Sequence, residues 1–208
     1  TKDKSIGRFL AKFLHEAGWD VWLYGRRARR IDKSGWHERK CDISNEKSIK
    51  KLLSEIKKLD LVMMLADTGA HFPLEKLTEN VVKKMINAKI IGSVLLNKAF
   101  ANKFSKLEKP MKIIWCAGKP SNKSRDLILY SLVNAGLVSY VNALNDHYKD
   151  FFEAYYLPTG LISPSTLGDD YIQKVGSESA RMAGHPRVIA DKVRQILDNK
   201  IAPGIIDI

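Results

Sequence analysis

The chain runs through Lys112-Ile-Ile-Trp-Cys116, then Tyr130-Ser-Leu-Val-Asn134, then Phe152-Glu-Ala-Tyr-Tyr-Leu157. The first and third stretches have the length and apolar content that are typical of strands. The middle stretch lies in a segment with helical spacing of apolar residues, from about 125 to 145. A strand, a helix and a second strand in this order predict two parallel strands joined by a crossover helix.

The same alternation continues on both sides of this unit. Further strands are predicted at Val21–Tyr24, Leu61–Ala66 and Gly204–Ile208, and further helices at Ile6–Ala17, Ile49–Ile56, Glu79–Phe100 and Pro186–Leu197. Ser44 is the expected N-cap of the second of these helices. The pattern predicts an α/β fold with a doubly wound parallel sheet in three layers, α/β/α. We expect residues 1–208 to form a single domain.

The beginning of the chain departs from this plan. A doubly wound sheet usually opens with a strand, whereas this sequence opens at Thr1 with a polar run that leads into a helix. Loss of a central strand would leave backbone ladder groups unpaired. We therefore expect the first strand to be absent from this sequence rather than from the fold.

Composition narrows the class of protein. Hydrophobic residues make up 45% of the chain, which is a globular composition. No run of 18 apolar residues occurs, so no transmembrane helix and no membrane partner are expected. The two cysteines, Cys41 and Cys116, lack metal-ligand spacing. They predict a reducing, cytoplasmic location and no metal site.

The charge is strongly positive. The net charge is +12, from 35 basic and 23 acidic residues, and the basic residues gather at 26–30, 47–58 and 103–112. Such an excess attracts polyanions, including nucleic acid. A solvated, lysine-rich surface is the favoured interpretation, because no recognised nucleic-acid motif accompanies the charge.

Several short motifs carry a resemblance to a known family. They are Thr1-Lys-Asp-Lys-Ser-Ile-Gly7-Arg8, Leu23-Tyr-Gly-Arg-Arg27, Cys41-Asp-Ile-Ser44, Tyr130-Ser-Leu-Val-Asn134 and Gly184-His-Pro186 with Ile189-Ala190. In this order and spacing, the chain resembles the short-chain dehydrogenase/reductase superfamily. The resemblance implies a Rossmann-type fold and a nicotinamide dinucleotide cofactor.

The resemblance also assigns cofactor-binding residues. Arg26 and Arg27 stand where a 2′-phosphate would bind, which implies NADP rather than NAD. Gly7 is the only one of the three turn glycines of the family that remains, so the alternative is that no dinucleotide binds. The resemblance implies that Asp42 lies beside the adenine. It also matches Met64-Leu-Ala-Asp67 to the Asn-Asn-Ala-Gly motif of the family, of which Ala66 remains. The full set of implied cofactor contacts is Thr1, Lys4, Ile6, Gly7, Arg26, Arg27, Asp42 and Ala66.

The catalytic positions of the family are altered. Tyr130 matches its catalytic tyrosine, but Asn134 replaces the lysine one helical turn later, and Lys89 replaces the active-site asparagine. The position of the catalytic serine falls on Ala117 or Gly118, neither of which carries a hydroxyl. We expect the Lys89 ammonium to approach Tyr130 and partly lower its pKa, because a nearby opposite charge favours the phenolate.

Two functions follow from these motifs. The first is an NADP-dependent oxidoreductase that acts on a small carbonyl or alcohol, with weak or lost activity, through Tyr130, Lys89 and Asn134. The alternative is a catalytically inactive pseudoenzyme that serves as a binding or scaffold module for nucleic acid or a protein. In the family, the helices that correspond to 79–100 and 125–145 form a dimer interface, so a homo-oligomer is expected.

Overall fold

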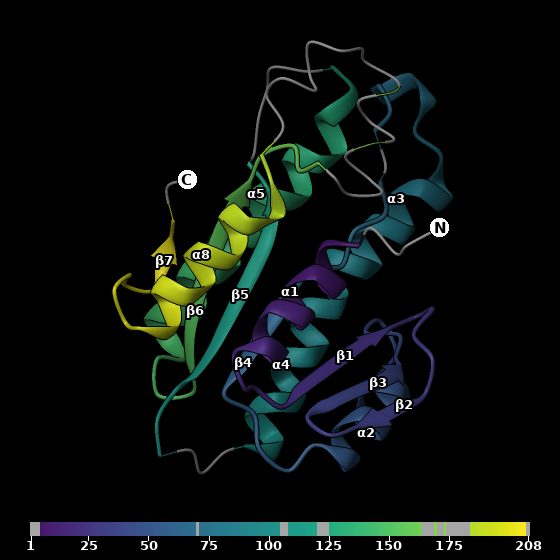
Figure 1. The fold of residues 1–208 in the computed structure, drawn as a ribbon. Coiled ribbons are helices and arrows are strands. Elements are labelled where there is room, and N and C mark those ends of the chain that lie inside the picture. Colours follow the sequence, from purple (N-terminus) through teal and green to yellow (C-terminus); the bar gives the residue numbers. More distant parts are fainter. Residues whose placement is uncertain are drawn as a thin grey trace. The chain divides into compact units, whose positions relative to one another are not determined.

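The computed structural model describes residues 5–69, 71–104, 108–119, 125–163 and 184–206, together with Asp169 and Gln173. The chain divides into two compact units. One unit is Thr1–Asp42 with Gly160–Ala202, and the other is Ile43–Thr159 with Pro203–Ile208. Each unit combines strands and helices, labelled in Figure 1.

The first unit is built on a three-stranded sheet. Its elements are α1 (Ile6–Glu16), β1 (Val21–Gly25), β2 (Ile31–Lys33), β3 (Trp36–Lys40) and α8 (Pro186–Leu197). The strand order is β1-β3-β2, with β1 parallel and β2 antiparallel to β3. The Ser5 side chain caps α1 by accepting a hydrogen bond from the Arg8 N–H at 3.1 Å, and α1 packs against α8.

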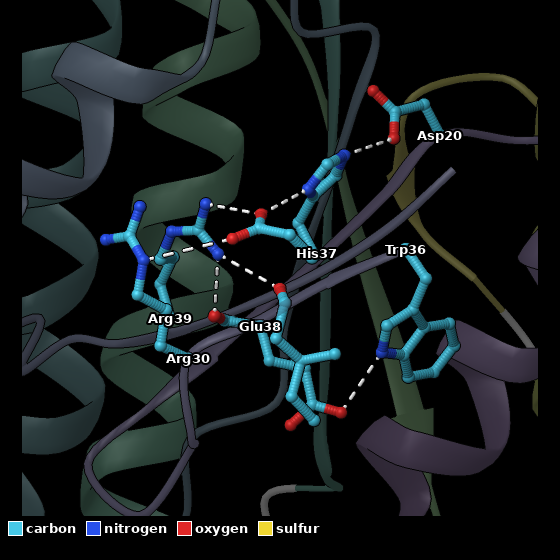
Figure 2. A network of polar contacts seen from close by, with 8 residues as sticks. Asp20, Arg30, Trp36, His37, Glu38 and Arg39 are labelled. Carbon is cyan, nitrogen blue, oxygen red and sulfur yellow. Dashed lines mark hydrogen bonds and ion pairs between the residues drawn. The ribbon is translucent and has the colours of Figure 1, made fainter. Parts of the chain in front are cut away.

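A dense polar network fixes the three strands of this sheet (Figure 2). The buried Glu38 carboxylate accepts two hydrogen bonds from Arg8, at 2.7 and 3.0 Å, and one from the Trp36 indole N–H at 3.0 Å. On neighbouring strands, the ring of Trp22 stacks on His37 with ring centroids 4.4 Å apart. Because a buried carboxylate needs several donors, this arrangement compensates for the loss of water around Glu38.

The second unit is built on a four-stranded parallel sheet in the order β4-β5-β6-β7. Its strands are β4 (Leu61–Met64), β5 (Met111–Gly118), β6 (Phe152–Thr159) and β7 (Gly204–Ile205). Its helical elements are α2 (Glu46–Glu55), η1 (Leu74–Lys76), α3 (Glu79–Ile86), the π-helical turn η2 (Asn87–Ile91), α4 (Gly92–Lys103), η3 (Arg125–Leu127) and α5 (Ile128–His147). The predicted α/β, Rossmann-type fold is confirmed.

The two long predicted helices lie side by side, as expected. Met85 of α3 and Leu129, Tyr130 and Val133 of α5 form one buried apolar cluster. The predicted helix 79–100 forms as one uninterrupted helical run from Glu79 to Lys103, in which the π-helical turn η2 joins α3 to α4. By length and composition alone, Arg125–His147 could also cross a membrane. In the structure, its buried side chains pack along β6 as those of a core helix do.

Two predictions need correction, and two strands were missed. The strand at Val21–Tyr24 forms, but it lies in a separate sheet, because β1 and β4 share no ladder in the described chain. Strands β2 and β3 were not predicted, since their charged side chains hide the alternation of a strand. The N-cap of α2 is Asn45 rather than Ser44, because the Asn45 side chain accepts the Ser48 N–H at 3.0 Å.

Candidate functional site

The candidate site lies within the second unit, where α5 and η2 meet. Tyr130 and Asn134 lie one turn apart on the buried face of α5, and Lys89 lies in the π-helical turn. All three are buried, with 8%, 1% and 3% of their surfaces exposed. A buried lysine is costly unless its charge is paired, so its partners decide what the site can do.

The partner of Lys89 is Asp67, which follows the end of β4. One carboxylate oxygen of Asp67 lies 3.0 Å from the Lys89 ammonium. The other accepts a hydrogen bond from the Tyr130 hydroxyl and a further one from the Gly69 N–H at 3.1 Å. The Asp67 carboxylate therefore bridges the two side chains that were expected to act on each other directly.

Two more groups complete the cluster. The Lys89 ammonium also donates to the Asn134 side-chain oxygen at 3.2 Å, and it lies 5.2 Å from the centre of the Tyr130 ring. The imidazole of His71 stacks on the same ring, 4.8 Å away and almost parallel to it. The sequence-predicted catalytic residues Tyr130, Lys89 and Asn134 are thus brought together.

The electrostatics of this cluster oppose proton donation by Tyr130. Burial raises the pKa of Tyr130, and the charge of Asp67 and the hydrogen bond to it raise the pKa further. Burial also opposes the ionisation of Asp67, but the Lys89 charge and the hydrogen bonds from Tyr130, Gly69 and Lys89 outweigh it and lower the pKa of Asp67. The expectation that Lys89 lowers the pKa of Tyr130 is therefore wrong, because the Lys89 ammonium forms an ion pair with Asp67 instead.

No hydroxyl occupies the position of the missing serine at the end of β5. Ala117 is buried, and a Cβ atom on Gly118 would lie 3.3 Å from the side-chain nitrogen of Asn134. The Gly118 carbonyl accepts a hydrogen bond from the Tyr156 hydroxyl at 2.7 Å. Burial raises the pKa of the neighbouring Cys116 thiol to about 12, so this thiol is neutral and unreactive at pH 7.

A small crevice adjoins the cluster between β4, β5, η2 and α5. It has room for about one water molecule. Its lining residues are Met64, Ala66, Ala88, Lys89, Ser93, Trp115, Cys116, Ala117 and Leu137. Within the part of the chain that the structure describes, no group of three or more His, Cys, Asp or Glu side chains could hold a metal ion.

The sequence-predicted cofactor residues divide between the two units. Thr1 and Lys4 lie outside the described residues, and Ile6 and Gly7 form the first turn of α1. Arg26 and Arg27 are exposed in the turn after β1, and Asp42 is exposed after β3. Ala66 is exposed after β4, in the second unit.

Two residues of the cluster were missed from the sequence. In the sequence, Asp67 is interpreted only as the loss of a family glycine and not as the gain of a carboxylate. A carboxylate at the carboxyl end of a parallel strand is a recognisable signal, since binding sites concentrate there. His71 carried no comparable signal, because it is one of five scattered histidines.

Comparisons with known proteins agree with this architecture. The family model for short chain dehydrogenases matches residues 2–151. A short chain dehydrogenase family protein from Francisella tularensis has a similar structure, with a TM-score of 0.81 and 17% identity over 98% of this chain and 92% of the other. The aldohexose dehydrogenase of Thermoplasma acidophilum has a TM-score of 0.81 at 13% identity. The match covers 97% of this chain and 87% of the other.

A third solved structure is the closed form of a serine dehydrogenase complexed with NADP+. It has a TM-score of 0.73 at 15% identity, and the match covers 91% of this chain and 83% of the other. No curated protein matches the chain significantly. The identities to the solved structures are low, so these likenesses concern the fold. The family model covers well over half of the chain, and the chain therefore belongs to the short chain dehydrogenase family.

Proposed function

We propose that this chain is a short-chain dehydrogenase that still binds NADP(H) but whose proton-donating site has become a structural ion-pair cluster. Carbonyl reduction is then weak or absent. One observation carries the proposal: the Asp67 carboxylate accepts a hydrogen bond from the Tyr130 hydroxyl and pairs with the Lys89 ammonium. A tyrosine whose pKa is raised above 10 gives up its proton too reluctantly to act as a general acid at neutral pH.

Two exposed arginines support the binding of a dinucleotide that carries a 2′-phosphate. Arg26 and Arg27 are exposed at the end of β1, and within the described part of the chain the structure records no ion pair or hydrogen bond for either side chain. Two such guanidinium groups suit a 2′-phosphate, which favours NADP over NAD. Bound NADPH would supply the hydride, while the protein would have to supply the proton.

An active oxidoreductase is the second candidate function. It is favoured by one specific feature: Lys89 and Asn134 have exchanged the positions that their residue types occupy in the family. Both groups still contact each other beside Tyr130. In this alternative, a small carbonyl substrate would receive its proton from Tyr130 after Lys89 leaves Asp67.

A scaffold function is the third candidate, and it requires that no dinucleotide binds. In that case, the chain acts through its surfaces, as a homo-oligomer in the cytoplasm or with another protein. The exposed apolar side chains Ile91 and Val94 near α4, and Ile128 and Leu132 on α5, favour self-association.

Binding and turnover are measured separately to distinguish these functions. We expect NADPH to raise the Tm more than NADH, because a ligand that binds only the folded state stabilises it. The Arg26→Ala/Arg27→Ala variant should remove this difference. Equal and weak effects of both nucleotides would reject the cofactor part of the proposal and favour the scaffold.

Turnover is then followed as NADPH oxidation with a panel of aldehydes and ketones. The proposal predicts rates near background that do not change in Tyr130→Phe. A measurable rate that is lost in both Tyr130→Phe and Lys89→Met would instead establish the active oxidoreductase. A gain of reduction in the variant Asp67→Gly/Lys89→Asn/Asn134→Lys/Gly118→Ser would show that the fold still supports the family's chemistry.

A further inference from the structure

The first unit carries an unusually basic surface that cofactor binding does not account for. We call it the arginine hairpin: Gly25–Lys40, which comprises the end of β1, strands β2 and β3 and their turns. Its exposed cationic side chains are Arg26, Arg27, Arg29, Arg30, Lys33 and Lys40. A 2′-phosphate would use at most two of them.

The acidic groups of this region are bound internally. Asp32 accepts from His37 at 2.8 Å and from Arg39 at 2.7 Å, and its other oxygen lies 3.8 Å from Arg30. The second ring nitrogen of His37 lies 3.2 Å from Asp20, and Figure 2 shows these contacts. Glu38 is held by Arg8 and Trp36, as described above. The two carboxylates of the hairpin, Asp32 and Glu38, therefore already have partners, and the exposed Arg30 is one of them.

The buried Arg39 has a carboxylate partner, whereas most of the exposed cations in the described hairpin do not. Among the described residues, the structure records no ion pair, hydrogen bond or ring contact for a set of five exposed side chains: Arg26, Arg27, Arg29, Lys33 and Lys40. Unpaired cations close together in sequence repel one another and gain from a bound polyanion.

The hairpin is also held in place before any ligand binds. The buried Arg39 guanidinium donates to the Ile31 carbonyl at 3.1 Å and lies 5.0 Å from the centre of the Trp22 ring. These contacts tie β2 to β3 and β3 to β1. A pre-organised surface loses less conformational entropy on binding than a flexible basic tail does.

We propose that the arginine hairpin binds the phosphate backbone of nucleic acid. Guanidinium groups bind phosphates through two parallel hydrogen bonds, and several of them can follow successive phosphates. An acidic lipid surface fits less well, because none of the exposed large apolar side chains of the described chain lies in the hairpin. This inference goes beyond the proposed cofactor function, since it rests on Arg29, Lys33 and Lys40 as well as on the pair beside the cofactor.

The test is fluorescence anisotropy of the full chain with a labelled single-stranded RNA of about 16 nucleotides, across a series of salt concentrations. Affinity should fall steeply with salt, to a Kd of about 10⁻⁴–10⁻⁶ M at physiological ionic strength. In Arg26→Gln/Arg27→Gln/Arg29→Gln, the slope of log K against log salt should become shallower by about 2, at roughly 0.7 for each lost phosphate contact.

A matched control removes the same charge elsewhere. Lys47→Gln/Lys50→Gln/Lys51→Gln changes three exposed lysines of α2 and should leave the slope nearly unchanged. Equal losses in both triple variants would mean that binding reflects net charge alone and would overturn the proposal. Absence of binding by the wild-type chain at low salt would overturn it as well.

A second variant separates nucleic acid from cofactor. Lys33→Gln/Lys40→Gln should weaken RNA binding severalfold and leave the NADPH-induced rise in Tm unchanged, because both lysines lie outside the cofactor pair. If this variant binds RNA as the wild type does, the proposal fails even where NADPH binding is intact. Hairpin-dependent binding to phosphatidylserine vesicles without RNA binding would also reject nucleic acid as the ligand.

Discussion

The hydrogen bond of the Tyr130 hydroxyl goes to a carboxylate, and this decides the chemistry of the site at the residue scale. A positive charge near a phenol favours its ionisation, whereas a carboxylate disfavours it. Lys89 has the charge that the family places near its tyrosine, but Asp67 neutralises it at 3.0 Å. Lys89 and Asn134 have exchanged the residue types of the family, which keeps a lysine near Tyr130. Asp67, which stands where the family has a glycine, counteracts this by neutralising the lysine charge.

The first prediction concerns the stability that Asp67 provides. Asp67→Asn leaves the buried Lys89 cation without a counter-charge, and we expect the free energy of unfolding to fall by about 2–3 kcal/mol. This is less than the ~3–5 kcal/mol typical of a broken buried pair, because the Asp67 side chain is 21% exposed. Urea denaturation measures the loss. The double variant Asp67→Asn/Lys89→Gln should recover part of it, and an additive double variant would contradict the pairing.

The second prediction concerns pH. The pKa of Asp67 is lower in the folded chain than its ordinary value of about 3.9. Its contribution to stability is therefore fully present above about pH 5 and is lost as the pH falls below 4 through the folded-state pKa. The difference in unfolding free energy between wild type and Asp67→Asn should be constant from pH 6 to 8 and shrink towards pH 3. A difference that grows on acidification would contradict the assignment.

At the scale of elements, the π-helical turn η2 places Lys89 against α5, and α4 begins directly after it at Gly92. A Cβ atom on Gly92 would lie 2.6 Å from two side-chain carbons of Ile43 and 3.2 Å from the Asn87 carbonyl oxygen. Such distances require a side chain or the backbone to move. Glycine at this position therefore permits the close packing of Ile43 on the start of α4.

The third prediction tests this packing. Gly92→Ala should lower the free energy of unfolding by about 1–3 kcal/mol, although alanine is the better helix former, because overpacking outweighs propensity. Denaturant unfolding gives the value. Removal of the two crowded carbons in Gly92→Ala/Ile43→Ala should cost less than the sum of the single changes. A Gly92→Ala chain as stable as the wild type would show that Ile43 moves aside freely.

The sequence predicts helices and strands well where the apolar periodicity is strong. It predicts them poorly where charged residues occupy the positions that face the interior. The central strands and the helix at α5 follow directly from their apolar residues, and they place Tyr130 and Asn134 on one buried face. Strand β3 reads Trp-His-Glu-Arg-Lys, and its buried Glu38 and Arg39 are explained only by partners on other elements. The Asp67 contacts depend in the same way on a loop conformation that no local pattern specifies.

At the scale of the whole molecule, helices of the second unit carry exposed apolar side chains, and from these we predict self-association. Leu132 on α5 is 67% exposed, and Ile128 one turn earlier is 45% exposed. Lone exposed apolar residues are common, but several on neighbouring helical elements are typical of an interface. The homo-oligomer implied by the family resemblance would use this surface.

The fourth prediction tests that surface. We expect the wild-type chain to sediment as a dimer or larger assembly, and Leu132→Arg to shift it to the monomer, because a charge in an apolar interface is not solvated. Leu74→Arg is the matched control, since Leu74 on η1 is 65% exposed and of the same residue type. Analytical ultracentrifugation of the three proteins gives the answer. A monomeric wild type, or equal dissociation by both variants, would reject this interface.

The most direct test of the central claim is the ionisation of Tyr130 itself. With ¹³C at the Cζ atom of tyrosine, NMR follows the Tyr130 signal as the pH rises, and Tyr130→Phe assigns that signal. The account predicts a protonated Tyr130 through the ordinary tyrosine pKa of about 10, because burial and Asp67 both raise its pKa. It also predicts a lower midpoint in Asp67→Asn. A wild-type Tyr130 that ionises at or below about pH 10 would contradict the account, because Tyr130 would then be as available for proton transfer as an ordinary tyrosine.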